Sequence, residues 1–133
     1  MILIDANVLI DVGMDDPAWA DWSQRQLDEA ADSDTPAIND VVYAELSVRY
    51  PRMEELDAML RQFQIDLAPI PREALFLAGK AYQRYRALGG IRTGVLPDFF
   101  IGAHALVAGI SLITRDAARY RTYFPGITLV APN

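Results

Sequence analysis

The chain of 133 residues contains no cysteine and only one histidine, His104. The lack of cysteine excludes a disulfide framework and a thiolate metal site, and a single histidine excludes zinc sites built mainly from imidazoles. A metal bound by this chain must therefore be held through oxygen, which favours Mg²⁺ or Mn²⁺. Carboxylates are the side chains that such a site would need.

Long apolar runs are also missing, since no stretch approaches the roughly 18 consecutive apolar residues of a membrane-spanning helix. The opening Met-Ile-Leu-Ile-Asp has no basic region and reaches a carboxylate too early for a signal peptide. We therefore expect a cytoplasmic protein with no membrane partner. Because 52% of the residues are hydrophobic and no linker divides the chain, residues 1–133 are expected to form a single domain that buries roughly two thirds of its unfolded surface.

Basic residues are scarce in the first part of the chain. Residues 1–40 hold ten acids and one base, residues 41–73 six acids and four bases, and residues 74–133 two acids and seven bases, so the net charge changes from −9 through −2 to +5. The overall charge of −6 argues against gripping nucleic acid through the field of the whole protein. The two acids of the last part, Asp98 and Asp116, nevertheless lie among arginines, which suits a phosphate-backbone substrate.

Four arginines are the candidates for contacts with such a substrate. Arg92 and Arg115 are favoured because they are close in sequence to the two acids. Arg84 and Arg86, like Lys80, fit a solvated helix face equally well.

Apolar runs predict short buried strands that end in carboxylates. Asp5 follows Ile2-Leu3-Ile4, with Asn7 in the expected loop beyond it, and Asp116 follows a strand at residues 112–115. Ligand sites in open α/β sheets lie off these strand ends. Asp98 belongs to the same edge, because Pro97 suits the first position of a helix that runs to about residue 108 before the chain returns along the second strand.

Glu45 is the fourth carboxylate. Asn39 looks like the N-cap of a helix after a strand at residues 36–38, and Glu45 falls about a turn and a half into that helix. Its side chain is long enough to reach over the sheet edge, although a solvated polar stripe is the alternative. The remaining elements expected are a helix capped by Asp15 or Asp16 and containing Trp19 and Trp22, helices at about 51–63 and 71–88, and strands at 65–67 and 127–130.

Four segments in this order resemble the PIN-domain ribonucleases, and specifically the VapC toxins of toxin–antitoxin pairs. They are Ile-Leu-Ile-Asp5-Ala-Asn7-Val-Leu-Ile-Asp11, Val-Val-Tyr43-Ala-Glu45-Leu, Leu-Pro97-Asp98-Phe-Phe-Ile-Gly-Ala-His104-Ala, and Leu-Ile-Thr114-Arg115-Asp116. Each segment alone is weak, but the set covers essentially the whole chain. Two positions depart from the common form: Asn39 stands where serine is usual, and His104 where a small residue is frequent.

The resemblance implies a PIN-like three-layer α/β/α sandwich with a central, mainly parallel sheet. It also implies an acidic quartet that binds Mg²⁺ or Mn²⁺, with Asn7 and Thr114 as supporting polar residues. The quartet consists of Asp5, Glu45, Asp98 and Asp116. The activity implied is metal-dependent hydrolysis of RNA phosphodiester bonds by a toxin that blocks translation.

The same resemblance implies three partners: an RNA substrate, a cognate antitoxin that covers the acidic groove, and a second copy of the chain in a homodimer. The composition of the early helices suggests where the antitoxin would bind, namely an aromatic surface formed by Trp19, Trp22, Tyr43 and Tyr50.

Other interpretations stay open at this point. A receiver or dehalogenase-like phosphotransfer domain also places an aspartate after its first strand, but a dehalogenase needs a second aspartate where Asn7 stands, and a receiver needs a strand-end lysine, whereas Lys80 lies in an expected helix. A catalytically silent binding module with the same fold is a further alternative. We also expect Asp11 and Asp40 to be solvated or capping residues, and His104 to be packed away from the metal.

Overall fold

The computed structural model describes residues 1–92 and 94–132. Within them, five strands form one sheet in the order β3-β2-β1-β4-β5, and every pair of neighbours is parallel. The strands are β1 (Ile2–Ile4), β2 (Pro36–Ile38), β3 (Asp66–Leu67), β4 (Ser111–Ile113) and β5 (Leu129–Val130). β1 lies in the centre, where Ile2 is in register with Pro36 of β2 and Ser111 of β4.

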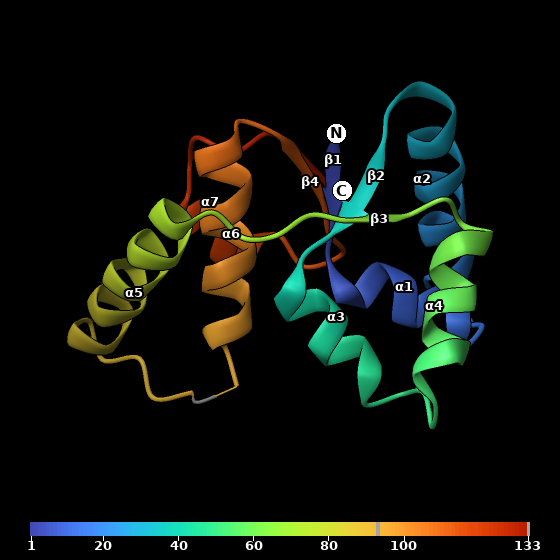
Figure 1. Ribbon diagram of the computed structural model, residues 1–133. Helices are drawn as coiled ribbons and strands as arrows, with labels where there is room; N and C mark the ends of the chain where they lie inside the picture. Colours follow the sequence, from blue (N-terminus) through green and yellow to red (C-terminus); the bar gives the residue numbers. More distant parts are fainter. Residues whose placement is uncertain (93, 133) are drawn as a thin grey trace.

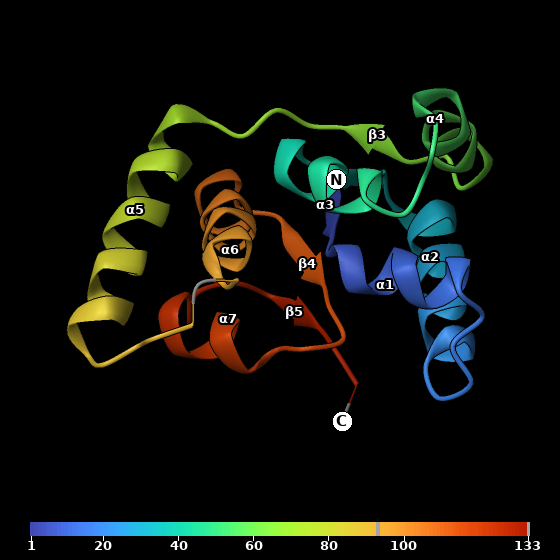
Figure 2. The ribbon, with the colours of Figure 1, turned by 90° about the horizontal axis from the view of Figure 1, so that it is seen from below.

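Seven helices surround the sheet in the described residues: α1 (Ala6–Gly13), α2 (Ala20–Ser33), α3 (Asp40–Ser47), α4 (Met53–Gln62), α5 (Arg72–Ala87), α6 (Leu96–Ala108) and α7 (Ala118–Tyr123). Helices α5 and α6 lie on one side of the sheet and α2 and α4 on the other (Figures 1 and 2). The predicted α/β/α sandwich with a central parallel sheet is thereby confirmed.

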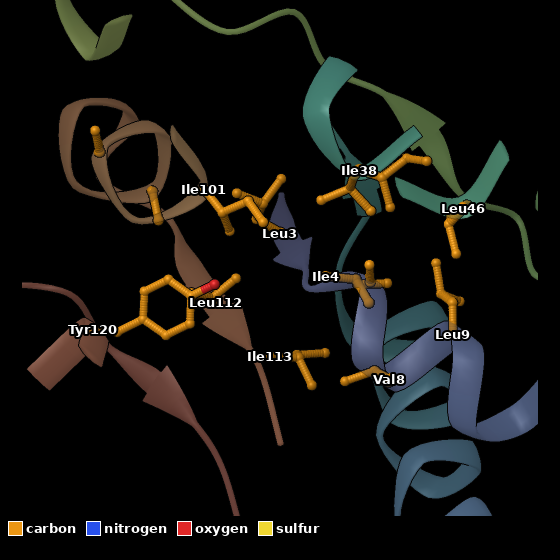
Figure 3. Packing of buried hydrophobic residues seen from close by; sticks show 14 of the residues in the cluster. Leu3, Ile4, Val8, Leu9, Ile38, Leu46, Ile101, Leu112, Ile113 and Tyr120 are labelled. Carbon is orange, nitrogen blue, oxygen red and sulfur yellow. The ribbon is translucent and has the colours of Figure 1, made fainter. Parts of the chain in front are cut away.

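The core explains why the two central strands read as continuous apolar runs. Leu3, Ile4, Leu112 and Ile113 are almost completely buried. Figure 3 shows Leu3 and Leu112 on the side of α6 and Tyr120, and Ile4 and Ile113 on the side of α1. Successive residues of a strand point to opposite faces, so a strand covered by helices on both faces must be apolar at every position.

Several helix boundaries follow the local sequence rules. The Asn39 side chain accepts a hydrogen bond from the Val42 amide at 3.0 Å and so caps α3, as predicted. Helix α6 ends at Gly109, whose φ of 67° lies in the left-handed region that glycine adopts without strain. Asp16 accepts hydrogen bonds from the amides of Ala18 and Trp19, so it organises the turn before α2.

One local expectation is wrong. Asn7 was expected in a loop, but α1 begins at Ala6, directly after the strand, with Asp5 as its extended N-cap residue. The short apolar stretch of residues 8–10 therefore continues as helix and packs on the sheet. Within the described residues, none of the helices combines the length and the apolar character that crossing a membrane would require.

Candidate functional site

Asp5 stands at the carboxyl end of the central strand and is only 5% exposed. Its Oδ2 atom accepts hydrogen bonds from the Thr114 hydroxyl at 2.9 Å and the Tyr120 hydroxyl at 2.8 Å. Burial raises the pKa of Asp5 from 3.8 to about 6; the hydrogen bond from Tyr120 works against this rise and the negative charge of Asp98 adds to it. The structure therefore holds this carboxylate in one orientation in an environment that disfavours its charge.

Asp98 lies in the first turn of α6, as predicted, and its Oδ2 is paired with the guanidinium of Arg119 from α7. Burial raises the pKa of Asp98, Arg119 opposes the rise, and the neighbouring charge of Asp116 adds to it. The positive charge of Arg92 also acts on Asp98. Asp98 therefore interacts both with a neighbouring acidic residue, Asp116, and with two arginines, Arg119 and Arg92.

Glu45 reaches the same place from α3. Burial raises its pKa to about 7, and the charges of Asp5 and then Asp98 contribute to the rise. Within the described residues, Glu45 Oε1 is buried and has no hydrogen-bond partner. A buried oxygen without a donor is costly unless a cation or water is supplied.

Asp116 is the most exposed member of the quartet. Its backbone amide donates to the Thr114 hydroxyl at 3.1 Å, which fixes the turn after β4, and its charge is felt by Asp98. The structure therefore places Asp5, Glu45 and Asp98 close enough for the charges of Asp5 and Asp98 to act on Glu45 and for that of Asp98 to act on Asp5, and it places Asp116 close enough to act on Asp98.

Asn7 and Thr114 connect the two central strand ends. The Asn7 amide donates to the Thr114 hydroxyl at 3.4 Å and to Asp5 Oδ2 at 3.5 Å, and Asn7 Oδ1 accepts from the Arg115 backbone amide at 3.1 Å. Thr114 is completely buried. Both residues lie where they can support Asp5, the position in which the resemblance placed them.

The expectation that Asp11 is solvated or capping is wrong. Asp11 is 2% exposed and forms a bidentate pair with Arg115, in which Nε lies 2.7 Å from Oδ2 and Nη2 3.2 Å from Oδ1. The Ser23 hydroxyl donates to the same carboxylate at 3.1 Å, and the guanidinium lies 5.6 Å from the ring centre of Trp19. Asp40 is exposed in the first turn of α3, as expected.

The other candidate arginines are accessible. Arg92 is exposed, and its backbone amide donates to the Tyr85 hydroxyl at 3.2 Å. Arg84 and Arg86 are exposed in the last turn of α5, and the Arg84 guanidinium lies 5.7 Å from the ring centre of Tyr123. The side chains of these three arginines are therefore accessible to a ligand at the surface.

His104 is a packed histidine, as expected. It is buried, and its Nδ1 lies 3.2 Å from the Asn39 side-chain nitrogen. Because Asn39 Oδ1 already accepts from Val42, the amide nitrogen faces the imidazole and Nδ1 acts as the acceptor. Burial lowers the pKa of His104, which keeps the ring neutral. The residue joins α6 to α3 and does not belong to the carboxylate site.

The contacts of Arg119 with Asp98 and of Tyr120 with Asp5 were not predicted from the sequence. Both lie on α7, a helix of only six residues, and each touches a quartet member that is distant along the chain. Arg119 is one of several arginines in its neighbourhood, and Tyr120 has the spacing of an ordinary core residue. No local pattern distinguishes either residue from its neighbours.

The donor set fits a hard divalent cation in its chemistry, because it consists of carboxylate oxygens with one buried oxygen, Glu45 Oε1, lacking a partner. Across residues 1–92 and 94–132, however, no three acidic or histidine side chains form a ready set that could hold a metal ion. Asp98 is turned to Arg119 instead. A cation bound at this site through Asp98 would have to displace Arg119 from the carboxylate or share the carboxylate with it.

Comparison with known proteins places this site in context. No curated protein matches the chain in sequence. Among solved structures, VapBC2 from Rickettsia felis bound to a promoter DNA fragment matches with a TM-score of 0.74 at 21% identity, covering 100% of both chains. DNA-bound VapBC from Salmonella typhimurium matches with a TM-score of 0.72 at 16% identity, covering 98% of this chain and 96% of that one.

VapBC-1 from nontypeable Haemophilus influenzae gives a TM-score of 0.71 at 18% identity, covering 98% of both chains. At these identities the likenesses establish the fold. The sequence profile of the PIN domain matches residues 2–125, which include all four carboxylates of the quartet. The chain therefore belongs to the PIN domain family.

Proposed function

We propose that this protein is a metal-dependent endoribonuclease that hydrolyses RNA phosphodiester bonds and acts as the toxin of a toxin–antitoxin pair. The observation that carries the proposal is the meeting of Asp5, Glu45 and Asp98 at one sheet edge, where the charge of Asp98 raises the pKa of Asp5 and the charges of Asp5 and Asp98 raise the pKa of Glu45. Carboxylates gathered at such cost are characteristic of functional sites. Membership of the PIN domain family supports the same conclusion.

The quartet would hold Mg²⁺, or Mn²⁺ in its place. A cation held there would supply Lewis-acid polarisation of the scissile phosphate and an activated water for hydrolysis that would leave a 5′-phosphate on one product. Asp5 contributes a carboxylate that Thr114 and Tyr120 keep in a fixed orientation. Burial raises the pKa of Glu45 to about 7, so its charged form is disfavoured in the cation-free protein.

The arginines would bind the RNA backbone. Arg92, Arg84 and Arg86 present accessible charges, and the charge of Arg92 reaches Asp98. Arg115 was predicted for the same role, but its guanidinium already makes the bidentate pair with Asp11, so it would contribute mainly its charge. Contacts to phosphate of this kind do not depend on base sequence and weaken as salt is raised.

The toxin role and the partners rest on the similar structures. Those from Rickettsia felis, Salmonella typhimurium and Haemophilus influenzae are VapBC proteins, and another similar structure is a toxin–antitoxin complex from Klebsiella pneumoniae. We propose by analogy that this chain is the VapC-type toxin, that it binds a cognate antitoxin, and that it forms a homodimer. Residues 1–133 would act as one nuclease domain in the cytoplasm, where the RNA substrate and translation are found.

The alternative is a PIN-fold module that binds partners without cutting. The pairing of Asp98 with Arg119, and the lack of a ready set of three ligands in the described residues, favour this alternative. Phosphotransfer by a receiver or a dehalogenase-like domain is set aside by membership of the PIN domain family.

The test is cleavage of a panel of structured and single-stranded RNAs by antitoxin-free protein with Mg²⁺, with Mn²⁺ and with EDTA. Wild type is compared with Asp98→Asn and with Asp40→Asn, which removes an exposed carboxylate outside the site. We expect metal-dependent cleavage in wild type and Asp40→Asn and none in Asp98→Asn. Cleavage in EDTA would refute the metal requirement, and a folded wild type that cuts none of the RNAs would favour the silent module.

A further inference from the structure

Two consecutive residues of α7 contact the two central carboxylates of the site. The guanidinium of Arg119 is paired with Asp98 Oδ2, and the hydroxyl of Tyr120 donates to Asp5 Oδ2 at 2.8 Å. Asp5 follows the end of β1 and Asp98 belongs to α6, so the short helix α7 contacts carboxylates from two different parts of the fold. Any shift of α7 would therefore act on the two carboxylates together.

The position of α7 is fixed by close packing on α6, beside which it lies in Figures 1 and 2. A Cβ atom added at Gly102 of α6 would lie 2.4 Å from Phe124 Cδ2 and 3.1 Å from Tyr120 Cδ1. Both aromatic residues are almost fully buried. Gly102 thus allows the close approach of α6 to Tyr120, and the contact of Tyr120 with Asp5 lies in the buried core.

We propose that α7 sets the affinity of the carboxylate site for divalent cations through two residues with opposite effects. Arg119 occupies Asp98 in the place of a cation and lowers the affinity, whereas Tyr120 holds Asp5 in the orientation that binds one and raises it. The inference rests on that part of the proposed function which assigns a divalent cation to the quartet. It does not depend on what the protein cleaves.

The argument for Arg119 is competition between like charges. A guanidinium and a divalent cation both seek the Asp98 carboxylate and repel each other, so the cation must displace the arginine or share the carboxylate with it. The side chains of Arg119 and Asp98 are 19% and 29% exposed, so solvent screens the pair only in part.

The argument for Tyr120 is preorganisation. Tyr120 and Thr114 both donate to Oδ2 of Asp5, so the carboxylate is tethered through one oxygen and cannot rotate freely. A ligand that is already oriented loses less conformational freedom when a cation binds. Removing the Tyr120 hydroxyl leaves Thr114 as the principal tether and should weaken binding.

The experiment measures cation binding directly, by titrating Mn²⁺ into metal-free protein and following free Mn²⁺ by electron paramagnetic resonance at low ionic strength. The variants are Arg119→Gln, Arg119→Lys and Tyr120→Phe. Arg121→Gln is the matched control, because Arg121 is an exposed arginine of the same helix. Thermal melts establish that each variant is folded.

We expect Arg119→Gln to bind Mn²⁺ about tenfold more tightly, since a neighbouring opposite charge changes the proton affinity of a carboxylate by at least that factor. Arg119→Lys should fall between Arg119→Gln and wild type, because it keeps a charge but loses the planar fork. Tyr120→Phe, which keeps the ring against Gly102, should bind about tenfold more weakly, the factor for one hydrogen bond to a charged group. Arg121→Gln should stay within about twofold, as distant surface charges are screened.

A merely structural role for α7 would move the Arg119 and Tyr120 variants in the same direction, so opposite shifts are the decisive result. If wild type binds Mn²⁺, Asp98→Asn abolishes binding and Arg119→Gln leaves it unchanged or weaker, the inference fails while the proposed cation site survives. If neither wild type nor Arg119→Gln binds Mn²⁺, the proposed cation site fails and the inference fails with it.

Discussion

Replacing Asp5 with asparagine should stabilise the cation-free protein at neutral pH, although it removes a predicted ligand. Burial raises the pKa of Asp5 from 3.8 to about 6 in the folded protein. At about 1.4 kcal/mol for each pH unit between these values, ionising Asp5 costs the folded state about 3 kcal/mol. Asparagine has nearly the same shape and can accept the hydrogen bonds of Thr114 and Tyr120 without carrying charge.

The sign of the pH dependence follows from the raised pKa. Below pH 3.8 Asp5 is protonated in both the folded and the unfolded state, so its charge costs nothing. As the pH rises towards 6, the unfolded state loses this proton while the folded state retains it, and stability falls. The advantage of Asp5→Asn should therefore be complete above about pH 6 and should vanish towards pH 3.8.

The assay is urea denaturation of wild type and Asp5→Asn in EDTA at pH 7 and pH 4. The control is Asp11→Asn, because Asp11 is equally buried but paired with Arg115 and Ser23, so neutralising it should destabilise the fold by about 1–3 kcal/mol. A gain of about 2–3 kcal/mol at pH 7 that disappears at pH 4 is expected for Asp5→Asn. No gain at pH 7, or the same gain at both values, would refute the reasoning.

Three further predictions test the same structure. Mg²⁺ at about 100 times its Kd should stabilise wild type by about 3 kcal/mol at pH 7 in thermal or urea unfolding and should leave Asp98→Asn unchanged, because only a folded site binds it. Burial lowers the pKa of His104 in the folded protein below its ordinary value of 6.5. The contribution of the neutral ring to stability is therefore present above pH 6.5 and is lost as the pH falls through the pKa of the folded state. The stability of wild type relative to His104→Gln should accordingly decline from pH 7 to pH 5, as measured by urea denaturation. Gly102→Ala should destabilise the fold by about 1–3 kcal/mol, because the new Cβ would lie 2.4 Å from Phe124, and an unchanged melting temperature would show that the helices can separate at little cost.

The central strands and the helix ends could be predicted because their causes are local. Strands buried on both faces must be apolar, which marks residues 2–4 and the pair Leu112-Ile113 in the sequence. The second strand was expected at residues 112–115 and is observed at Ser111–Ile113. The Asn39 cap and the left-handed Gly109 likewise depend on single residues and their nearest neighbours. The topological rule for parallel sheets then placed the carboxylates at one edge.

Contacts between distant residues could not be predicted. The ion pair of Arg115 and Asp11 joins residues separated by 104 positions. Because of this pairing Asp11 is buried, although we expected it to be exposed to solvent. The sequence around Asp11 does not indicate this pairing, because an aspartate at this position of the first helix could equally well be exposed to solvent. The contacts of Arg119 and Tyr120 depend in the same way on where α7 packs, which is set by Gly102 on another helix.

Two arginine–aspartate pairs lie beside the strand ends, Arg115 with Asp11 and Arg119 with Asp98, and they differ in how far the aspartate is accessible to other ligands. The Asp11 side chain is almost fully buried and also accepts a hydrogen bond from Ser23 of α2, while the Arg115 guanidinium lies over Trp19 at the start of the same helix. Replacing Arg115 would therefore leave the buried Asp11 carboxylate without its ion-pair partner. Asp98 and Arg119 are both more accessible than Asp11, and Asp98 is the residue that we propose as a cation ligand. The first pair therefore holds the fold around the site, and the second is the pair that would have to open under the cation binding that we propose.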